Sequence, residues 1–154
     1  MTSVRRVNLI EYRDEWLDEL VDLWRASFEA GVGVTDPHPL AEQRQYFIDV
    51  VRPHNAVRLA VLDGRLVGFI AASEASVAQL FVRIGFQRRG IGTRMLAWAK
   101  ARSGGSLWLY TFERNRGACA FYTRSGFTVV ARGFEPEWQL ADVKYQWPAP
   151  DHAT

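Results

Sequence analysis

The stretch from Val77 to Leu96 constrains the fold most, because it joins an apolar run to a glycine-rich turn and then to a helical pattern. Its first six residues, VAQLFV, are mostly β-branched, aromatic or aliphatic, which predicts a central strand. After Gly90 and Gly92, apolar residues recur at helical spacing. The glycines therefore lie at the start of a predicted helix, where unpaired backbone N–H groups and the helix dipole favour an anion.

The charges around the turn also favour an anion. From Ala75 to Phe112 the chain carries six basic residues and no acidic one, although the net charge of the whole chain is only +2. The local field is therefore positive, and the glycines expose backbone that a pyrophosphate can approach closely. The turn is predicted to bind a molecule that contains phosphate.

Two common phosphate-binding loops fit this turn poorly. A P-loop requires Lys and then Ser or Thr directly after Gly85-x-x-x-x-Gly90, but Ile-Gly stands there. A dinucleotide fingerprint requires a third glycine where Met95 stands, and its acidic residue would be Glu113, in or just after another predicted strand. The first pattern is excluded and the second is weak.

The turn instead resembles the Q/R-x-x-G-x-G/A signature of the GNAT acyltransferase superfamily, which it matches at Gln87-Arg88-Arg89-Gly90-Ile91-Gly92. A later stretch, NRGACAFYTRSGF, is similar to the family's downstream motif, N-x-x-A-x-x-F-Y followed by G-F. The matching residues are Asn115, Ala118, Phe121, Tyr122, Gly126 and Phe127. An ordinary glycine-rich connector would explain neither the paired arginines nor the second motif.

This resemblance implies a GNAT-like α+β fold, with a central mixed, mostly antiparallel sheet of about seven strands and about four flanking helices. The sheet would splay between Val77–Val82 and Leu107–Phe112, and acetyl-CoA would lie in the gap. Its pyrophosphate would sit on the amides of the glycine turn, and its pantetheine arm would pair with the strand before that turn. The residues assigned to acetyl-CoA are Leu80, Phe81, Val82, Gln87, Arg88, Arg89, Gly90, Ile91, Gly92, Thr93, Asn115, Ala118, Phe121 and Tyr122.

The remaining elements are predicted from periodicity, caps and turn signals. Asp14 is predicted to cap a helix that runs to about Ala30, and Asp63-Gly64 is a hairpin signal. The further strands are predicted at Val4–Ile10, Arg58–Leu62, Leu66–Ala72, Phe127–Ala131 and Asp142–Trp147. The further helices are predicted at Ala41–Val51, after a loop from Gly31 to Leu40, and between Asn115 and Gly126.

Acetyl transfer to an amine needs a polarised thioester carbonyl, a neutral amine and a proton for the departing thiolate. The resemblance assigns that proton to the phenol of Tyr122. Glu74, in the turn before the central strand, is a candidate base, and a chain of waters is the alternative. Cys119 raises an acyl-cysteine route, but no histidine is near it in sequence, and the resemblance favours direct attack in a ternary complex.

The acceptor is predicted as a class of molecule. The resemblance places its pocket beside the Gly31–Leu40 loop and a late loop with Glu135, Glu137 and Trp138. The two carboxylates would attract a cationic amine, and an ordinary acidic surface loop is the alternative. His38, flanked by prolines in the first loop, is expected to face solvent rather than to act in catalysis. The prediction is an N-acetyltransferase for a primary amine of a small molecule or peptide; the rival is a non-catalytic acyl-CoA-binding or regulatory module.

Composition limits the other functional classes. The 154 residues, 48% of them apolar, predict one domain over residues 1–148 with a tail over 149–154. A single cysteine and three dispersed histidines argue against a disulfide framework and a metal site. No apolar stretch has the length of a signal peptide or a membrane span, so a cytoplasmic protein without a membrane or nucleic-acid partner is expected. The family resemblance also allows a homodimer.

Overall fold

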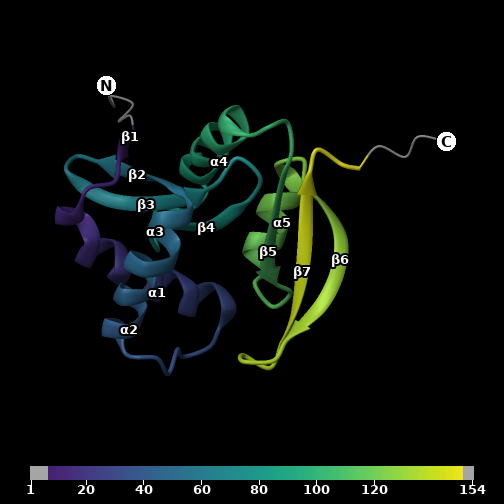
Figure 1. Cartoon of the computed structure of the whole chain (residues 1–154), viewed down its shortest axis with the longest axis horizontal. Helices are drawn as coiled ribbons and strands as arrows, with labels where there is room; N and C mark the ends of the chain where they lie inside the picture. Colours follow the sequence, from purple (N-terminus) through teal and green to yellow (C-terminus); the bar gives the residue numbers. More distant parts are fainter. Residues whose placement is uncertain (1–6, 151–154) are drawn as a thin grey trace.

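Two antiparallel sheets lie side by side in this chain (Figure 1), in a computed structural model that describes residues 7–150. The first sheet has the order β1-β2-β3-β4, from β1 (Asn8–Glu11), β2 (Ala56–Leu62), β3 (Arg65–Ala72) and β4 (Val77–Val82). The second has the order β5-β7-β6, from β5 (Leu107–Phe112), β6 (Thr128–Glu135) and β7 (Leu140–Trp147). The α-helices are α1 (Leu17–Val32), α2 (Leu40–Tyr46), α3 (Arg52–His54), α4 (Ile91–Arg102) and α5 (Arg116–Arg124).

Helices cover both faces of the first sheet, because its central strands are apolar on both sides. Leu59 on β2 belongs to the core cluster formed with α1, whereas its neighbour Ala60 belongs to the cluster formed with α4. Successive strand residues point to opposite faces, so each strand feeds both clusters. The second sheet is covered on one face by α5, through Leu109, Val143 and Tyr145.

The two sheets touch at one end of β4 and β5. An isolated parallel bridge joins Ser76 to Trp108, and beyond it the two strands are paired only with strands of their own sheets. The predicted α+β architecture and the splay between Val77–Val82 and Leu107–Phe112 are therefore confirmed. The splay divides what was expected as one mixed sheet into two antiparallel ones.

Several predicted elements have different bounds. The first strand runs over Asn8–Glu11, and Val4 to Arg6 of the prediction lie outside the described residues. Asp14 does not cap α1, because it lies in a 3-10 turn (Asp14–Trp16) and accepts a hydrogen bond from Arg52 Nη1 at 2.7 Å. The helix predicted at Ala41–Val51 is α2 followed by a π-helical turn over Phe47–Val51.

The last two strands are longer than their patterns suggested. β6 reaches Glu135 and β7 begins at Leu140, so only a short turn separates them. β6 is an edge strand whose residues are exposed on both faces, apart from partly buried Glu135. An edge strand of this kind lacks the alternation of apolar and polar residues by which strands are recognised. Among residues 7–150, no helix is both long and apolar enough to cross a membrane.

Candidate active site

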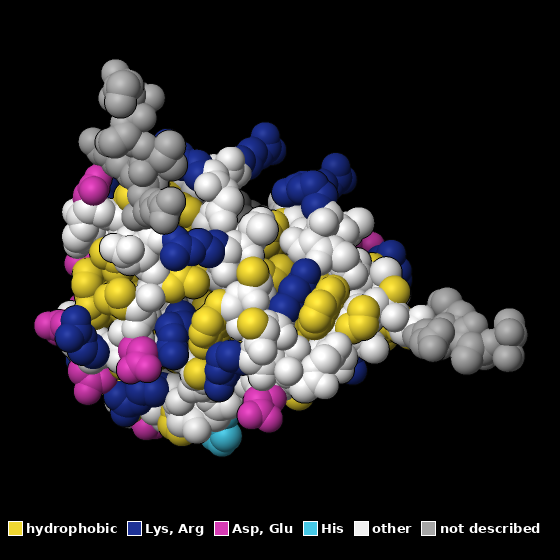
Figure 2. Space-filling model, turned by 90° about the horizontal axis from the view of Figure 1, so that it is seen from above, with side chains coloured by type: hydrophobic (Ala, Val, Ile, Leu, Met, Phe, Trp, Pro, Cys, Tyr) yellow, Lys and Arg dark blue, Asp and Glu magenta, His cyan; other side chains and the backbone are white. Residues whose placement is uncertain are grey.

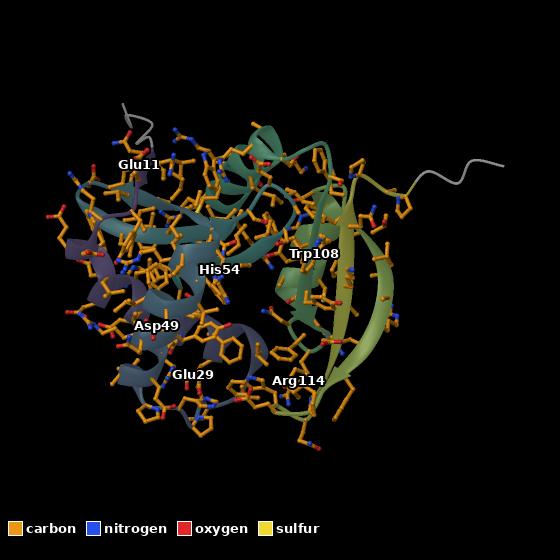
Figure 3. All side chains as sticks on the ribbon, in the orientation of Figure 1. Glu11, Glu29, Asp49, His54, Trp108 and Arg114 are labelled. Carbon is orange, nitrogen blue, oxygen red and sulfur yellow. The ribbon has the colours of Figure 1, made fainter. Side chains whose placement is uncertain are left out.

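A cleft of about 600 Å³ opens where β4 and β5 diverge. β4 forms one wall, and β5, β7 and α5 form the other. Side chains of α1, α2 and the loops between α1 and α2 and between β6 and β7 close its far end, which we call the acceptor end. Figure 3 shows side chains from both halves of the molecule reaching into the space between the two sheets.

The glycine turn leaves the start of α4 uncapped. Gly90 is the N-cap residue in a left-handed conformation (φ 81°), and no side chain of residues 7–150 accepts a hydrogen bond from the first amides of the helix. Arg88 also has a positive φ of 62°, and residues 87–90 are all exposed. Left-handed residues beside a helix start turn successive N–H groups toward one point, an arrangement that binds anions.

Basic side chains surround this turn. Arg88, Arg89 and Arg94 are exposed, and the guanidinium of Arg89 lies 5.1 Å from the centre of the Phe86 ring. Figure 2, which looks onto the α4 side of the molecule, shows Lys and Arg side chains across the middle of that face. Arg83 has a structural role instead, because its Nε donates to the backbone oxygen of Leu66 at 2.7 Å.

β4 presents a free backbone edge to the cleft. The N–H of Arg83 donates to Val67 on β3 at 2.7 Å, whereas the carbonyl of Val82 points the other way and accepts from the hydroxyl of Ser27 at 3.1 Å. Backbone groups alternate in direction along an antiparallel strand, so the N–H and C=O of Leu80 also point away from β3 and into the gap. Ser27, on α1, was not singled out from the sequence.

The second motif forms α5, whose two faces line different cavities. Asn115, Ala118 and Tyr122 face the main cleft, while Phe121 and Ser125 line a smaller cavity of about 200 Å³ between α4 and α5. Asn115 is the N-cap of α5, and its Oδ1 accepts a hydrogen bond from the N–H of Ala118 at 3.1 Å. The smaller cavity also contains the exposed Arg124, which the sequence analysis did not select.

Tyr122 is held in an apolar environment at the cleft wall. It is 6% exposed, and its ring contacts those of Phe121, Phe127 and Tyr145 at centroid distances of 5.2, 5.7 and 5.9 Å. Burial raises the pKa of its phenol well above the ordinary value of 10.0, and the nearby Cys119 raises the pKa further. The hydroxyl is therefore a proton donor throughout the neutral pH range.

The structure does not bring Glu74 to the same place as Tyr122. Glu74 is exposed in the turn between β3 and β4, at the closed end where the sheets touch, and it does not line the cleft. Its backbone carbonyl accepts from the N–H of Gly104 at 3.1 Å. Cys119 also lies outside the cleft lining, with its thiol 3.7 Å from the carbonyl oxygen of Phe112.

His38 lies at the acceptor end between two carboxylates. Its Nδ1 is 2.7 Å from Asp36 Oδ1, and its Nε2 is 3.0 Å from Glu137 Oε1. The hydrogen bond to Asp36 raises the pKa of His38, and Glu137 adds to the shift. The expectation that this histidine would face solvent is confirmed in part: its side chain is 39% exposed, but both ring nitrogens contact carboxylates and the residue lines the cleft.

A comparison of the sequence with known protein families agrees with this geometry. Residues 13–127 match the acetyltransferase (GNAT) family. The chain belongs to that family. A curated relative, the peptidyl-lysine N-acetyltransferase YiaC of Escherichia coli strain K12, is 33% identical over 87 residues, which are 56% of this chain and 59% of YiaC. The chain therefore matches less than two thirds of that relative's length.

Solved structures share the GNAT fold at low identity. The apo form of YjaB from Escherichia coli superposes with a TM-score of 0.73 at 24% identity, over 92% of this chain and 97% of YjaB. PaiA N-acetyltransferase from Thermoplasma acidophilum, solved in complex with coenzyme A, gives a TM-score of 0.71 at 17% identity, over 90% of this chain and 98% of PaiA. At these identities the similarity establishes the fold.

Both loops that the sequence places beside the acceptor pocket of this GNAT chain line the cleft, but several other lining residues carry no sequence signal. Trp24 and Phe28 belong to the core cluster around α1 and also line the cleft, and neither was singled out from the sequence as a site residue. Tyr46, Tyr110 and Asp142 line it as well, and no motif marks them. Among residues 7–150, no cluster of His, Cys, Asp and Glu side chains has the geometry to hold a metal ion.

Proposed function

We propose that this GNAT-family protein transfers the acetyl group of acetyl-CoA to a primary amine, by direct attack in a ternary complex. The observation that carries the proposal is the position of Tyr122. Its buried phenol lines the same cleft as the free edge of β4, and that strand leads directly into the uncapped start of α4. A proton donor and a backbone surface suited to a donor molecule thus share one cavity.

The residues present fit acetyl-CoA as the donor. The pyrophosphate would be held by the amides from Arg89 to Thr93, with Gln87, Arg88 and Arg89 beside them. Open space at Gly90 supports this placement, because a Cβ built there would meet no atom within 4 Å. Leu80, Phe81 and Val82 would carry the pantetheine arm, and Asn115, Ala118 and Phe121 of α5 would border it.

Bound acetyl-CoA would supply an electrophilic thioester carbonyl. The Leu80 N–H is proposed to donate to the carbonyl oxygen, since it points into the gap from the middle of β4. The Tyr122 phenol is proposed to protonate the departing sulfur, because its raised pKa keeps the proton in place until the thiolate forms. Both groups come from rigid elements, so neither needs to be recruited from a loop.

The proton of the incoming ammonium is proposed to leave through water in the cleft. The acceptor end is lined by the carboxylates of Asp36, Glu42, Glu135, Glu137 and Asp142, which favour water and cations over anions. Glu74 is the alternative base, acting through water from outside the cleft lining. The name of the relative YiaC, a peptidyl-lysine N-acetyltransferase, supports an amine as acceptor.

A thiol-release assay tests the proposal. The protein is incubated with acetyl-CoA and a panel of primary amines, and free coenzyme A is measured with a thiol reagent while the acetylated amine is identified by mass spectrometry. Amine-dependent thiol release is expected from the unmodified chain. Binding of acetyl-CoA by calorimetry without thiol release for any amine would identify a binding module and overturn the proposal.

A further inference from the structure

We propose that the acceptor is a small linear diamine or polyamine, and that the contact between His38 and Glu137 excludes polypeptide acceptors. This inference rests on the proposed acetyltransferase function and names the acceptor of that same cleft. It is carried by three features of the cleft, namely a tie between two loops, two carboxylates without a partner on different elements, and an aromatic lining.

The tie joins segments that are about a hundred residues apart. His38 lies in the loop between α1 and α2, and Glu137 lies in the turn between β6 and β7, with 3.0 Å between Nε2 and Oε1. The ring of Trp138 packs against His38 at 5.7 Å and against Phe28 at 5.1 Å. Figure 1 shows the loop and the turn side by side at the bottom of the molecule.

The loop that carries His38 is itself anchored. Asp36 accepts from His38, and its side chain is only 9% exposed and lies 3.5 Å from Arg25 Nε. The backbone N–H of Asp36 donates to Glu29 at 2.6 Å, and Glu29 is labelled in Figure 3 on α1 beside this loop. The contacts of Asp36 with Arg25 and Glu29 thus fix the position of His38 independently of Glu137.

The tie closes one end of the cleft. A lysine within a polypeptide carries chain on both sides, and a bound polypeptide lies along a groove or a sheet edge, so this chain needs room where the lysine enters. With the two loops joined, a polypeptide would have to break the contact between His38 and Glu137 and move Trp138. A small amine that enters whole does not meet this obstacle.

Two carboxylates of the cleft remain without a partner among residues 7–150. Asp36 and Glu137 are paired with His38, and Glu135 accepts from the backbone N–H of Trp138 at 2.6 Å. The carboxylates of Glu42 on α2 and of partly buried Asp142 on β7 have no hydrogen bond or ion pair within the described part of the chain. Glu42 is exposed at the acceptor end and Asp142 belongs to the wall that contains β7, so a cation held in the cleft would interact with both charges and would offset the desolvation of the partly buried Asp142.

The cation that they hold cannot be the reacting amine, because the nucleophile must be neutral when it attacks. A second ammonium on the same molecule meets this requirement. Between the carboxylates and β5 the lining is aromatic, with Trp24 and Tyr46 at a centroid distance of 6.4 Å and Tyr110 and Phe112 on the facing strand. Such walls bury a methylene chain and attract an ammonium through the ring faces.

The test compares acceptors of matched length in the thiol-release assay. 1,4-Diaminobutane, butylamine and a peptide with one internal lysine and blocked ends are offered to the full chain. We expect kcat/KM for the diamine to exceed that for butylamine and for the peptide by about tenfold or more. Asp142→Asn and Glu42→Gln should each reduce the preference for diamine over butylamine severalfold. Asp49→Asn is the matched control, since Asp49 is exposed, bonds to Gln45 and does not line the cleft.

Opening the tie should admit the peptide. His38→Ala, and independently Glu137→Gln on the exposed turn, should raise the ratio of peptide to diamine kcat/KM severalfold. Equal kcat/KM for butylamine and diamine, or a preference of the unmodified chain for the peptide, would overturn this inference while the acetyltransferase function stands. Absence of thiol release with every amine, despite bound acetyl-CoA, would overturn the proposed function and this inference with it.

Discussion

The ring of Phe121 on α5 lies directly over Gly92 on α4, so closely that a Cβ at residue 92 would be 3.1 Å from its Cζ atom. The glycine therefore does two things: it exposes the start of α4, and it lets the two helices of the donor side approach one another. The motif glycine is therefore required for packing, in addition to its proposed role in giving a phosphate access to the backbone.

Replacing Gly92 with valine should damage both roles. The added side chain must displace the Phe121 ring, which is expected to cost about 1–3 kcal/mol of unfolding free energy and to weaken acetyl-CoA binding. Urea unfolding and calorimetry measure the two effects. In a Phe121→Leu background the same substitution should cost less, because the ring is gone. Equal costs in both backgrounds would show that the contact with Phe121 is not the cause.

Tyr122→Phe should separate binding from chemistry. The variant keeps the ring contacts to Phe121, Phe127 and Tyr145 and removes only the hydroxyl, so turnover should fall about a hundredfold while the Kd for acetyl-CoA stays within about twofold. Tyr145→Phe is the matched control, because its hydroxyl bonds to the Cys119 carbonyl at 3.5 Å. Unchanged turnover in Tyr122→Phe would remove its assignment as the acid.

The pH dependence follows from the direction of the Tyr122 shift. Because burial raises the pKa of this phenol above 10.0, the protonated form that donates to the sulfur persists at alkaline pH. The rate should therefore rise with pH as the amine loses its proton, without a decline up to about pH 10. Steady-state rates at saturating amine from pH 6 to pH 10 measure this. A decline beginning near pH 8 would contradict the assignment.

Local signals were enough to predict the donor side. Gly90 and the periodicity after it mark the start of α4, and the Asp63-Gly64 pair forms the turn of the β2–β3 hairpin, with both residues at positive φ. These features depend on residues close in sequence, whose backbone preferences are strong. The family resemblance added the splay of the sheets, which no local pattern contains.

Contacts between distant residues decided the rest. Aspartate is a common helix N-cap residue, but the carboxylate of Asp14 accepts a hydrogen bond from Arg52, far along the chain. The helix α1 starts three residues later. His38 and Glu137 were both singled out from the sequence, each as a loop residue, yet nothing in either loop indicates that they meet. Such pairings are set by how the two sheets pack, so they appear only in the folded chain.

Glu74→Gln should leave both the turnover and its pH dependence close to those of the unmodified chain. The reason is its place in the exposed turn at the closed end of β4, away from the residues that line the cleft. Rates at subsaturating amine between pH 6 and pH 9 provide the measurement, with Glu113→Gln as an exposed control that bonds to Arg132 at 3.0 Å. A shifted acid limb in Glu74→Gln alone would establish Glu74 as the base.

The contact between His38 and Glu137 should weaken as pH rises. The folded pKa of His38 is raised, chiefly by its hydrogen bond to Asp36 and further by Glu137, so the stabilisation is complete below the ordinary value of 6.5 and is lost as pH passes the raised value. Asp36 is held in place by Arg25 as well. When His38 loses its charge, the contact between His38 and Glu137 is therefore expected to weaken before the contact between His38 and Asp36.

The measurement is the difference in Tm between the unmodified chain and Glu137→Gln. This difference should be largest near pH 6 and should shrink toward pH 9, because neutral His38 has only one N–H to share between two carboxylates. Gln at position 38 cannot titrate. The difference in Tm between His38→Gln and the double variant His38→Gln/Glu137→Gln should therefore be the same at pH 6 and at pH 9. A pH-independent difference in the unmodified chain would mean that His38 does not titrate in this contact.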